Sequence, residues 1–140
     1  MRHGSGIGHG TLATTLLGFA CLAAGDSARA NALFDESLAF LEAMVSQGAD
    51  TPRWPYEIAL ILAARGDPER GITQLESAYD LGFRWMWMLQ LEPMLDPLRG
   101  DPRFLRLTER VRDDVDVMRS QLEANDSISS VRDNVPRIRL

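Results

Sequence analysis

A glycine-aspartate pair recurs in this sequence in the same setting, and it constrains the fold more than any other feature. Gly25-Asp26 and Gly66-Asp67 each open a five-residue segment that ends in arginine, and the two segments align without gaps. Glycine suits the left-handed backbone position after a helix end, and aspartate caps the start of the next helix. The two pairs lie 41 residues apart, and Gly100-Asp101 follows 34 residues later. Such periods are typical of helical solenoids, in which a helix pair buries its apolar surface only against a stacked neighbour.

The pattern of apolar residues around these pairs predicts two kinds of helix. Residues 11–24, and a segment that begins between Thr51 and Pro55 and ends at Arg65, are apolar over nearly the whole circumference. Such helices are typically buried between neighbours. Residues 27–47 and 68–81 instead repeat apolar side chains at steps of three and four, which is typical of helices with one buried face.

Shorter elements and then one long helix are predicted after Gly82. Residues 83–91 predict a short helix, and residues 92–99 contain two prolines and predict at most one helical turn. From Pro102 to about Glu123 the chain carries its cleanest apolar stripe, which suits the end of a stack. The stripe consists of Phe104, Leu107, Val111, Val115, Met118 and Leu122.

Length and composition indicate one folded domain with two polar ends. The chain has 140 residues, of which 45% are hydrophobic, enough to bury a core. Residues 1–10 are rich in glycine and predict a flexible leader, and residues 125–140 predict a polar tail. We therefore predict an all-α fold over residues 11–124. It is an antiparallel helix-hairpin solenoid of about two and a half repeats, closed by a long amphipathic C-terminal capping helix.

The predicted hairpins resemble those of the tetratricopeptide repeat family. In the first unit, five residues match the family pattern at the expected offsets: Leu17, Gly18, Gly25, Ala30 and Phe34. In the second unit Gly66 and Ala78 match, while the other pattern positions carry Ile58, Ala59, Gly71 and Leu75. Cys21 stands where the family has an aromatic residue. Residues 91–104 are similar to a motif that closes repeat arrays in bacterial multidomain regulators, including adenylate-cyclase-like and winged-helix signalling proteins.

The resemblance implies where a partner would bind. In the family, ligands contact the concave face that the first helix of each pair lines. Carried over by position, that face is lined by Thr15, Phe19, Leu22, Arg53, Tyr56, Leu60 and Ala63. A lining that is apolar apart from one arginine suits a partner helix or an apolar peptide.

A second candidate surface is the segment Arg84-Trp85-Met86-Trp87-Met88. Aromatic residues, methionine and arginine are enriched at binding surfaces, so part of this segment is expected to be exposed. The alternative is that Trp85 and Met88 pack beneath the last helix while Met86 and Trp87 fill the neighbouring groove. From the two surfaces together, the candidate partner-binding residues are Phe19, Leu22, Arg53, Tyr56, Leu60, Arg84, Trp85 and Trp87.

The sequence offers little for catalysis or for a metal. His3 and His9 are the only histidines, and both lie in the leader, where no rigid scaffold positions them. Cys21 therefore lacks a base that would activate it as a nucleophile. The aspartates at 113, 114 and 116 lie one and two positions apart on a helix, so their side chains do not converge on one cation. We expect no enzymatic activity, no cofactor and no metal.

Charge and hydropathy narrow the class of partner. The net charge is −5, all fifteen basic residues are arginine, and the pI is about 5.0, which opposes nucleic-acid binding. The apolar stretch Leu12–Ala24 is too short to span a bilayer, so we expect no membrane partner. A single cysteine excludes an intrachain disulfide and fits a reducing compartment, and a cytoplasmic location is expected.

Two functional hypotheses follow. The first is a non-catalytic scaffold that binds a peptide, a partner helix or its own copy through an apolar and aromatic surface, with a homodimer as one outcome. The second is a sensory or regulatory segment of a larger bacterial signalling or transcription-regulating protein. A small enzyme with an unrecognised site is a third, weaker alternative.

Overall fold

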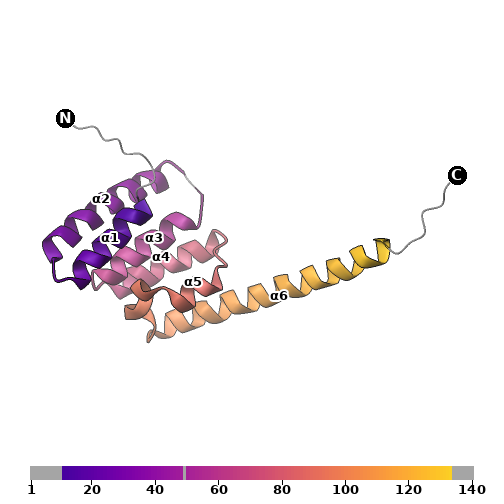
Figure 1. The fold of residues 1–140 in the computed structure, drawn as a ribbon. Coiled ribbons are helices and arrows are strands. Elements are labelled where there is room, and N and C mark those ends of the chain that lie inside the picture. The colour runs from indigo at the N-terminus through magenta and orange to yellow at the C-terminus, as the bar shows by residue number, and fades with distance from the viewer. Residues whose placement is uncertain (1–10, 49, 134–140) are drawn as a thin grey trace.

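The computed structural model describes residues 11–48 and 50–133, and the regular elements in this range are helices joined by turns and short loops (Figure 1). The helices are α1 (Thr11–Ala23), α2 (Ser27–Ser46), α3 (Arg53–Ala64), α4 (Pro68–Asp80), α5 (Met86–Leu91), the 3-10 helix η1 (Pro93–Leu98) and α6 (Pro102–Asp133). The described residues contain no strand, so the all-α prediction is confirmed. The predicted leader, residues 1–10, lies outside the described residues, as does the end of the predicted tail, residues 134–140.

The two aligned glycine-aspartate pairs form the same helix-to-helix turn. Gly25 and Gly66 have φ angles of +87° and +79°. In both turns the amides of the glycine and of the following aspartate donate to carbonyl groups in the last turn of the preceding helix, with N···O distances of 2.9–3.1 Å. Asp26 and Asp67 each accept the backbone N–H three residues further on, as N-caps do. The repeated pair therefore encodes two equivalent helix hairpins, α1–α2 and α3–α4.

The third pair builds a different connection. Gly100 has no positive φ, and it follows η1 instead of an α-helix. Asp101 still accepts the backbone N–H of Arg103 at 2.8 Å and so marks the start of α6. Residues 92–99 were predicted to make at most one turn of helix. This was too short, because the six residues of η1 complete about two turns at three residues per turn.

The helices pack in chain order. α1 packs mainly on α2 and α3 mainly on α4, while α2 also contacts α3, and η1 covers α3 and α4. The four helices lie side by side in Figure 1, with α5 and the start of α6 following α4. All nine residues from Pro55 to Ala63 in α3 are buried. The prediction that this helix is surrounded by neighbours is confirmed.

α1 does not share that environment. Leu16 and Leu17 are 44% and 46% exposed, and Ala13, Ala20 and Ala23 are exposed as well. The prediction that α1 is buried between neighbours is therefore wrong. α1 is the first helix of the series, and no other described helix packs on its outer face. Its inner face meets α2, where Phe34 lies over Gly18.

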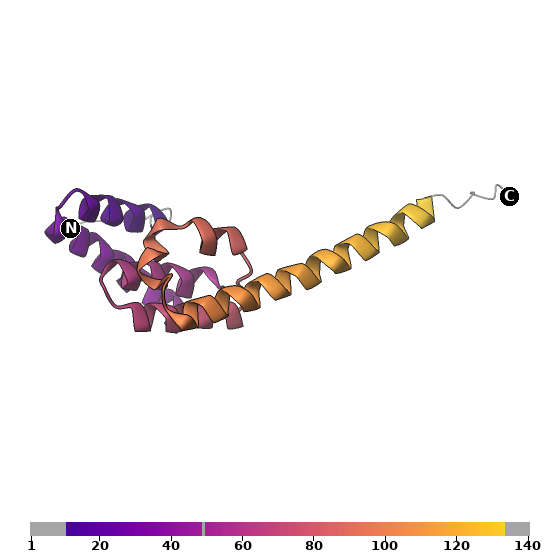
Figure 2. The ribbon, with the colours of Figure 1, turned by 90° about the horizontal axis from the view of Figure 1, so that it is seen from below.

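α6 is longer than its sequence predicts and leaves the body of the molecule. It runs ten residues past Glu123 to Asp133, so residues 125–133, assigned above to the polar tail, continue the helix. Phe104, Leu107 and Val111 of the predicted stripe are buried, but Met118 and Leu122 are 40% and 64% exposed. Both views show the C-terminal part of α6 extending away from the other helices (Figures 1 and 2). Only the first half of the stripe therefore packs against the other helices.

A cluster around Tyr79, here called the Tyr79 clamp, fastens α6 to α4. The guanidinium carbons of Arg84 and Arg110 lie 4.0 and 4.4 Å from the centroid of the Tyr79 ring. The Tyr79 hydroxyl donates to Oδ2 of Asp114 at 2.5 Å, and the same oxygen lies 3.0 Å from Nε of Arg84. Cation–π contacts and charge-assisted hydrogen bonds thus join α4, the segment before α5, and α6.

Candidate functional site

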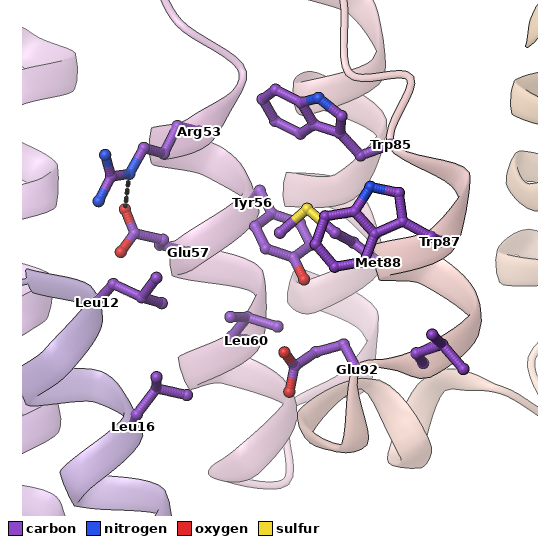
Figure 3. A pocket seen from close by; sticks show the side chains of 11 residues that line it. Leu12, Leu16, Arg53, Tyr56, Glu57, Leu60, Trp85, Trp87, Met88 and Glu92 are labelled. Atoms are coloured by element: carbon purple, nitrogen blue, oxygen red, sulfur yellow. Dashed lines mark hydrogen bonds and ion pairs between the residues drawn. The ribbon is translucent and has the colours of Figure 1, made fainter.

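One groove brings together side chains from α1, α3 and α5, and we call it the α1–α3–α5 groove. Its volume is about 430 Å³, within the range of protein ligand sites. α3 lies between the other two segments, with α1 on one side and the α5 segment on the other (Figure 3). The groove is lined by Leu12, Leu16, Arg53, Tyr56, Glu57, Leu60, Trp85, Trp87, Met88, Leu91 and Glu92.

Large apolar side chains at this groove are unusually exposed. Trp87 and Leu91 are 61% and 73% exposed, and Leu16 and Trp85 exceed 40%. Trp87 and Leu91 lie four residues apart on α5, so both occupy one face of that helix. Contiguous apolar surface of this kind marks interaction sites in folded proteins more often than isolated exposed residues do.

The segment from Phe83 to Leu91 divides its aromatic residues between the core and the groove. Phe83 and Leu89 are buried and anchor the segment. The Phe83 ring stacks on Tyr56 at a centroid distance of 5.0 Å and meets Trp85 edge-on at 5.1 Å. Trp85 therefore lies outside the core, as does Trp87. Of the two alternatives given by the sequence, the partly exposed surface describes the tryptophans, while Met86 and Met88 are half-buried against the core.

Glu57 is a buried carboxylate in the groove with one oxygen unsatisfied. Its side chain is 1% exposed, and Oε2 accepts from Nε of Arg53 at 3.2 Å. Oε1 has no hydrogen-bond partner in the part of the chain that the structure describes. Burial raises the pKa of this carboxyl above its usual range, and the charge and hydrogen bond of Arg53 oppose the shift.

Tyr56 presents a second unsatisfied polar atom. Its side chain is buried, and its hydroxyl has no hydrogen-bond partner among the described residues. In Figure 3 the hydroxyl points toward the space between Leu60, Met88 and Glu92. Burial raises the pKa of the hydroxyl, and the charges of Glu92 and Glu57 raise it further. Glu92 itself accepts the backbone N–H of Met94 through Oε1 at 3.0 Å, which fixes its position at the start of η1.

The eight predicted binding residues separate into two groups. Five of them line the groove together: Arg53, Tyr56, Leu60, Trp85 and Trp87. The others lie elsewhere. Phe19 and Leu22 are partly buried against the core, and α1 contributes Leu12 and Leu16 to the groove in their place. Arg84 belongs to the Tyr79 clamp, where Nη1 also donates to the carbonyl groups of Tyr79 and Phe83.

Sequence reasoning missed Glu57, although a signal for it exists. Glu57 is the only charged residue between Tyr56 and Ala64, and Arg53 precedes it by one helical turn. A lone charge on a helix that is apolar all round must be buried with a partner or face a site. Glu92 carried no such signal, because its position follows from the fold of η1. Thr15 and Ala63, the remaining positions carried over from the family, are buried.

Two of the aspartates that the sequence offered for a metal site make structural contacts instead. Asp114 binds Tyr79 and Arg84, and Asp116 lies 3.8 Å from Arg119. Within residues 11–48 and 50–133, no three histidine, cysteine or acidic side chains are placed to hold a metal ion. Cys21 is a free, half-buried thiol at the edge of the core. His3 and His9 lie outside the described residues.

No described helix combines the length and the hydropathy that a bilayer span requires. Comparison of the chain with protein-family models, curated proteins and solved structures found no match.

Proposed function

We propose that this chain is a non-catalytic, tetratricopeptide-like scaffold that binds the apolar face of a peptide or partner helix in the α1–α3–α5 groove. One observation carries the proposal. Four large apolar side chains that are each more than 40% exposed surround a single groove: Leu16, Trp85, Trp87 and Leu91. Tryptophan and tyrosine dominate the binding energy of many interfaces when a partner covers them.

The order of the helices supports the tetratricopeptide-like part of the proposal. In this proposal α1, α3 and α5 are the first helices of three successive units, and in the resembled family such helices line the ligand-binding face. The hairpins α1–α2 and α3–α4 use the same turn and pack one after the other. We infer that α5, η1 and α6 correspond to an incomplete third unit, so that the proposed array has about two and a half repeats closed by a long helix.

Capture from native lysate tests this function. The immobilised chain is compared with Trp87→Ala and Leu91→Ala, two changes at exposed groove positions that should leave the fold intact. Leu105→Ala is the matched control, because Leu105 is 52% exposed and does not line the groove. Captured proteins are identified by mass spectrometry, and their affinities are then measured with purified components.

The proposal expects one captured protein to be retained by the wild type and by Leu105→Ala and to be lost by both groove variants. Removal of a central tryptophan should weaken binding by about 30-fold or more, since such residues contribute about 2 kcal/mol or more. If both groove variants keep every captured protein at unchanged affinity, the groove is not the binding surface.

The projecting part of α6 favours a second candidate, association through this helix. Every side chain from residue 116 to residue 128 is exposed, including Val117, Met118, Leu122 and Ile128. Most of the stability of a protein helix comes from packing of its apolar face, so packing on another helix would stabilise this projecting segment. The second helix would come from another copy of the chain or from a larger signalling protein that contains this segment.

Light scattering separates these cases for the isolated chain. A dimer mass that reverts to a monomer mass in Leu122→Glu would support self-association through α6. A monomer at all concentrations in the wild type would remove the homodimer.

A further inference from the structure

We propose that the α1–α3–α5 groove selects for a basic side chain, so that the bound amphipathic helix places a lysine or arginine among its apolar contacts, against Glu57, Glu92, the hydroxyl of Tyr56 and the ring of Trp87. This inference rests on the proposed function and adds the chemistry of the partner. It comes from the charges, the unsatisfied atoms and the aromatic rings of the groove.

Carboxylates outnumber cations in the groove. Glu57 and Glu92 line it, and Arg53 is the one basic residue among the lining residues. The charge of Arg53 is already used, since its Nε lies 3.2 Å from Oε2 of Glu57 and its guanidinium lies 5.4 Å from the centre of the Trp54 ring. The groove therefore keeps an excess of negative charge that a cation on the partner would neutralise.

The unsatisfied polar atoms of the groove could also accept hydrogen bonds from a donor group on the partner. Oε1 of Glu57 and the hydroxyl of Tyr56 belong to side chains that are 1% and 2% exposed, and both lack a hydrogen-bond partner within the described ranges. A carboxylate oxygen can only accept, and a tyrosine hydroxyl can accept as well as donate. An ammonium or guanidinium group brings three or more donors on one flexible stem.

Among the aromatic side chains of the groove, Trp87 is the most open to a cation, because it is 61% exposed, whereas Tyr56 is buried and its ring stacks on Phe83. Elsewhere in the described chain, arginines already lie over Trp54 and Tyr79. No arginine lies over Tyr56, Trp85 or Trp87 in the same part of the chain. Lysine and arginine side chains are attracted to such electron-rich faces, most strongly when water is excluded.

The electrostatics at the Tyr56 hydroxyl agree with this assignment. Burial raises the pKa of this hydroxyl most, and the negative charges of Glu92 and Glu57 raise it further. Arg99 opposes them, but its charge is spread over Asp96 and the carbonyl groups of Leu89 and Glu92.

The apolar rim makes an amphipathic helix the suitable occupant. Leu12, Leu16 and Leu91 surround the polar atoms and would remain exposed beside a small amine or a polar polycation. A helix with apolar residues at steps of three and four would cover them, as helix-in-groove complexes do. One basic residue within that apolar face would reach Glu57 and Tyr56.

Three synthetic peptides test the inference. They share one amphipathic, leucine-rich helical sequence and differ at one central position of the apolar face, which is lysine, norleucine or glutamate. Norleucine keeps the aliphatic chain of lysine and removes the ammonium group. Binding to the full chain is measured by the change in tryptophan fluorescence and confirmed by calorimetry.

The lysine peptide should bind about tenfold more tightly than the norleucine peptide, and the glutamate peptide should bind most weakly. The preference for lysine should fall below about threefold in Glu57→Gln and in Glu92→Gln. It should persist in Glu123→Gln, a control that removes one carboxylate from the exposed part of α6.

Two results would overturn the inference. If norleucine binds as tightly as lysine, the groove is purely apolar, and the proposed function stands without the basic residue. If none of the three peptides binds, a basic amphipathic helix is not the occupant. The capture experiment then decides separately whether the groove binds any protein.

Discussion

The hairpins α1–α2 and α3–α4 have the same turn and similar first helices, yet their burial differs sharply. Nine consecutive residues of α3 are buried. In α1, over residues 12–23, only Thr15 and Gly18 are buried. The difference lies in the neighbours, because α2 and α4 enclose α3 while α1 lies at the end of the series. An apolar circumference thus shows that a helix requires neighbours, and its position in the stack decides whether it has them.

The largest expected effect contrasts one apolar residue in each of the helices α1 and α3. Ile61→Ala in α3 should lower the free energy of unfolding by about 3–4 kcal/mol, because Ile61 is fully buried and its removal leaves a cavity. Leu17→Ala in α1 should cost less than about 1 kcal/mol, because that side chain is already 46% exposed. Urea titrations followed by circular dichroism measure both values. Equal costs would mean that the outer face of α1 is covered in solution.

Glycine-to-alanine substitutions in the two hairpins should change the free energy of unfolding by intermediate amounts. A Cβ at Gly18 would lie 2.7 Å from Cε1 of Phe34, whose ring is fully buried, so Gly18→Ala should destabilise the chain by about 1–3 kcal/mol. At Gly71 in α4 the nearest atom would lie 3.5 Å away, an ordinary contact. Gly71→Ala should therefore stabilise the chain by about 0.5–1 kcal/mol through helix propensity. Chemical denaturation of both variants checks the opposite signs, and a stable Gly18→Ala would show that α1 can move off α2.

The smallest effect concerns Glu57, a charge in the most enclosed helix. Burial raises the pKa of its carboxyl, so the folded chain holds this proton more tightly than the unfolded chain. Its contribution to stability is therefore fully present at acid pH, below the usual range of the group, and is lost as the pH rises through the raised pKa.

Glu57→Gln has no carboxyl group to ionise, so it does not lose stability as the pH rises. It should raise the melting temperature by about 2–4 °C at neutral pH. The difference should shrink toward pH 4. Arg53, the partner of Glu57, is 54% exposed, so loss of the ion pair costs little. Thermal melts of both proteins across this pH range test the sign, and a variant that is less stable at neutral pH would contradict it.

The sequence predicts those parts of the fold that local chemistry determines. Gly25-Asp26 and Gly66-Asp67 form the predicted turns because each combines a left-handed glycine with an N-cap. Gly100-Asp101 has the same two residue types, but it follows a 3-10 helix, and its glycine does not adopt the left-handed conformation. The end of α6 was misplaced for a similar reason. Residues 125–133 are rich in serine, aspartate and β-branched residues, whose low helix propensity predicts an earlier end.

The sequence predicted that alternate helices line the candidate site. It did not predict the polar groups of the site. Arg53, Tyr56 and Leu60 were predicted from the resemblance to the tetratricopeptide family, and their spacing of three and four residues places them on one face of α3. The contribution of α1 depends on how that helix is rotated and shifted along its axis, which places Leu12 and Leu16 at the groove instead of Phe19 and Leu22. Glu92 enters only through the path of η1. Such placements follow from tertiary packing, which single-sequence periodicity does not contain.

The Tyr79 clamp holds α6 near its start, so a small tilt of the helix at this point moves its C-terminal end much further. From Val115, just beyond the clamp, to Asp133 the helix extends about 27 Å at 1.5 Å per residue, so a tilt of about 10° at the clamp carries its tip through about 5 Å. Small rearrangements of Arg84, Arg110 and Asp114 around one tyrosine ring are thereby amplified at the far end of the molecule.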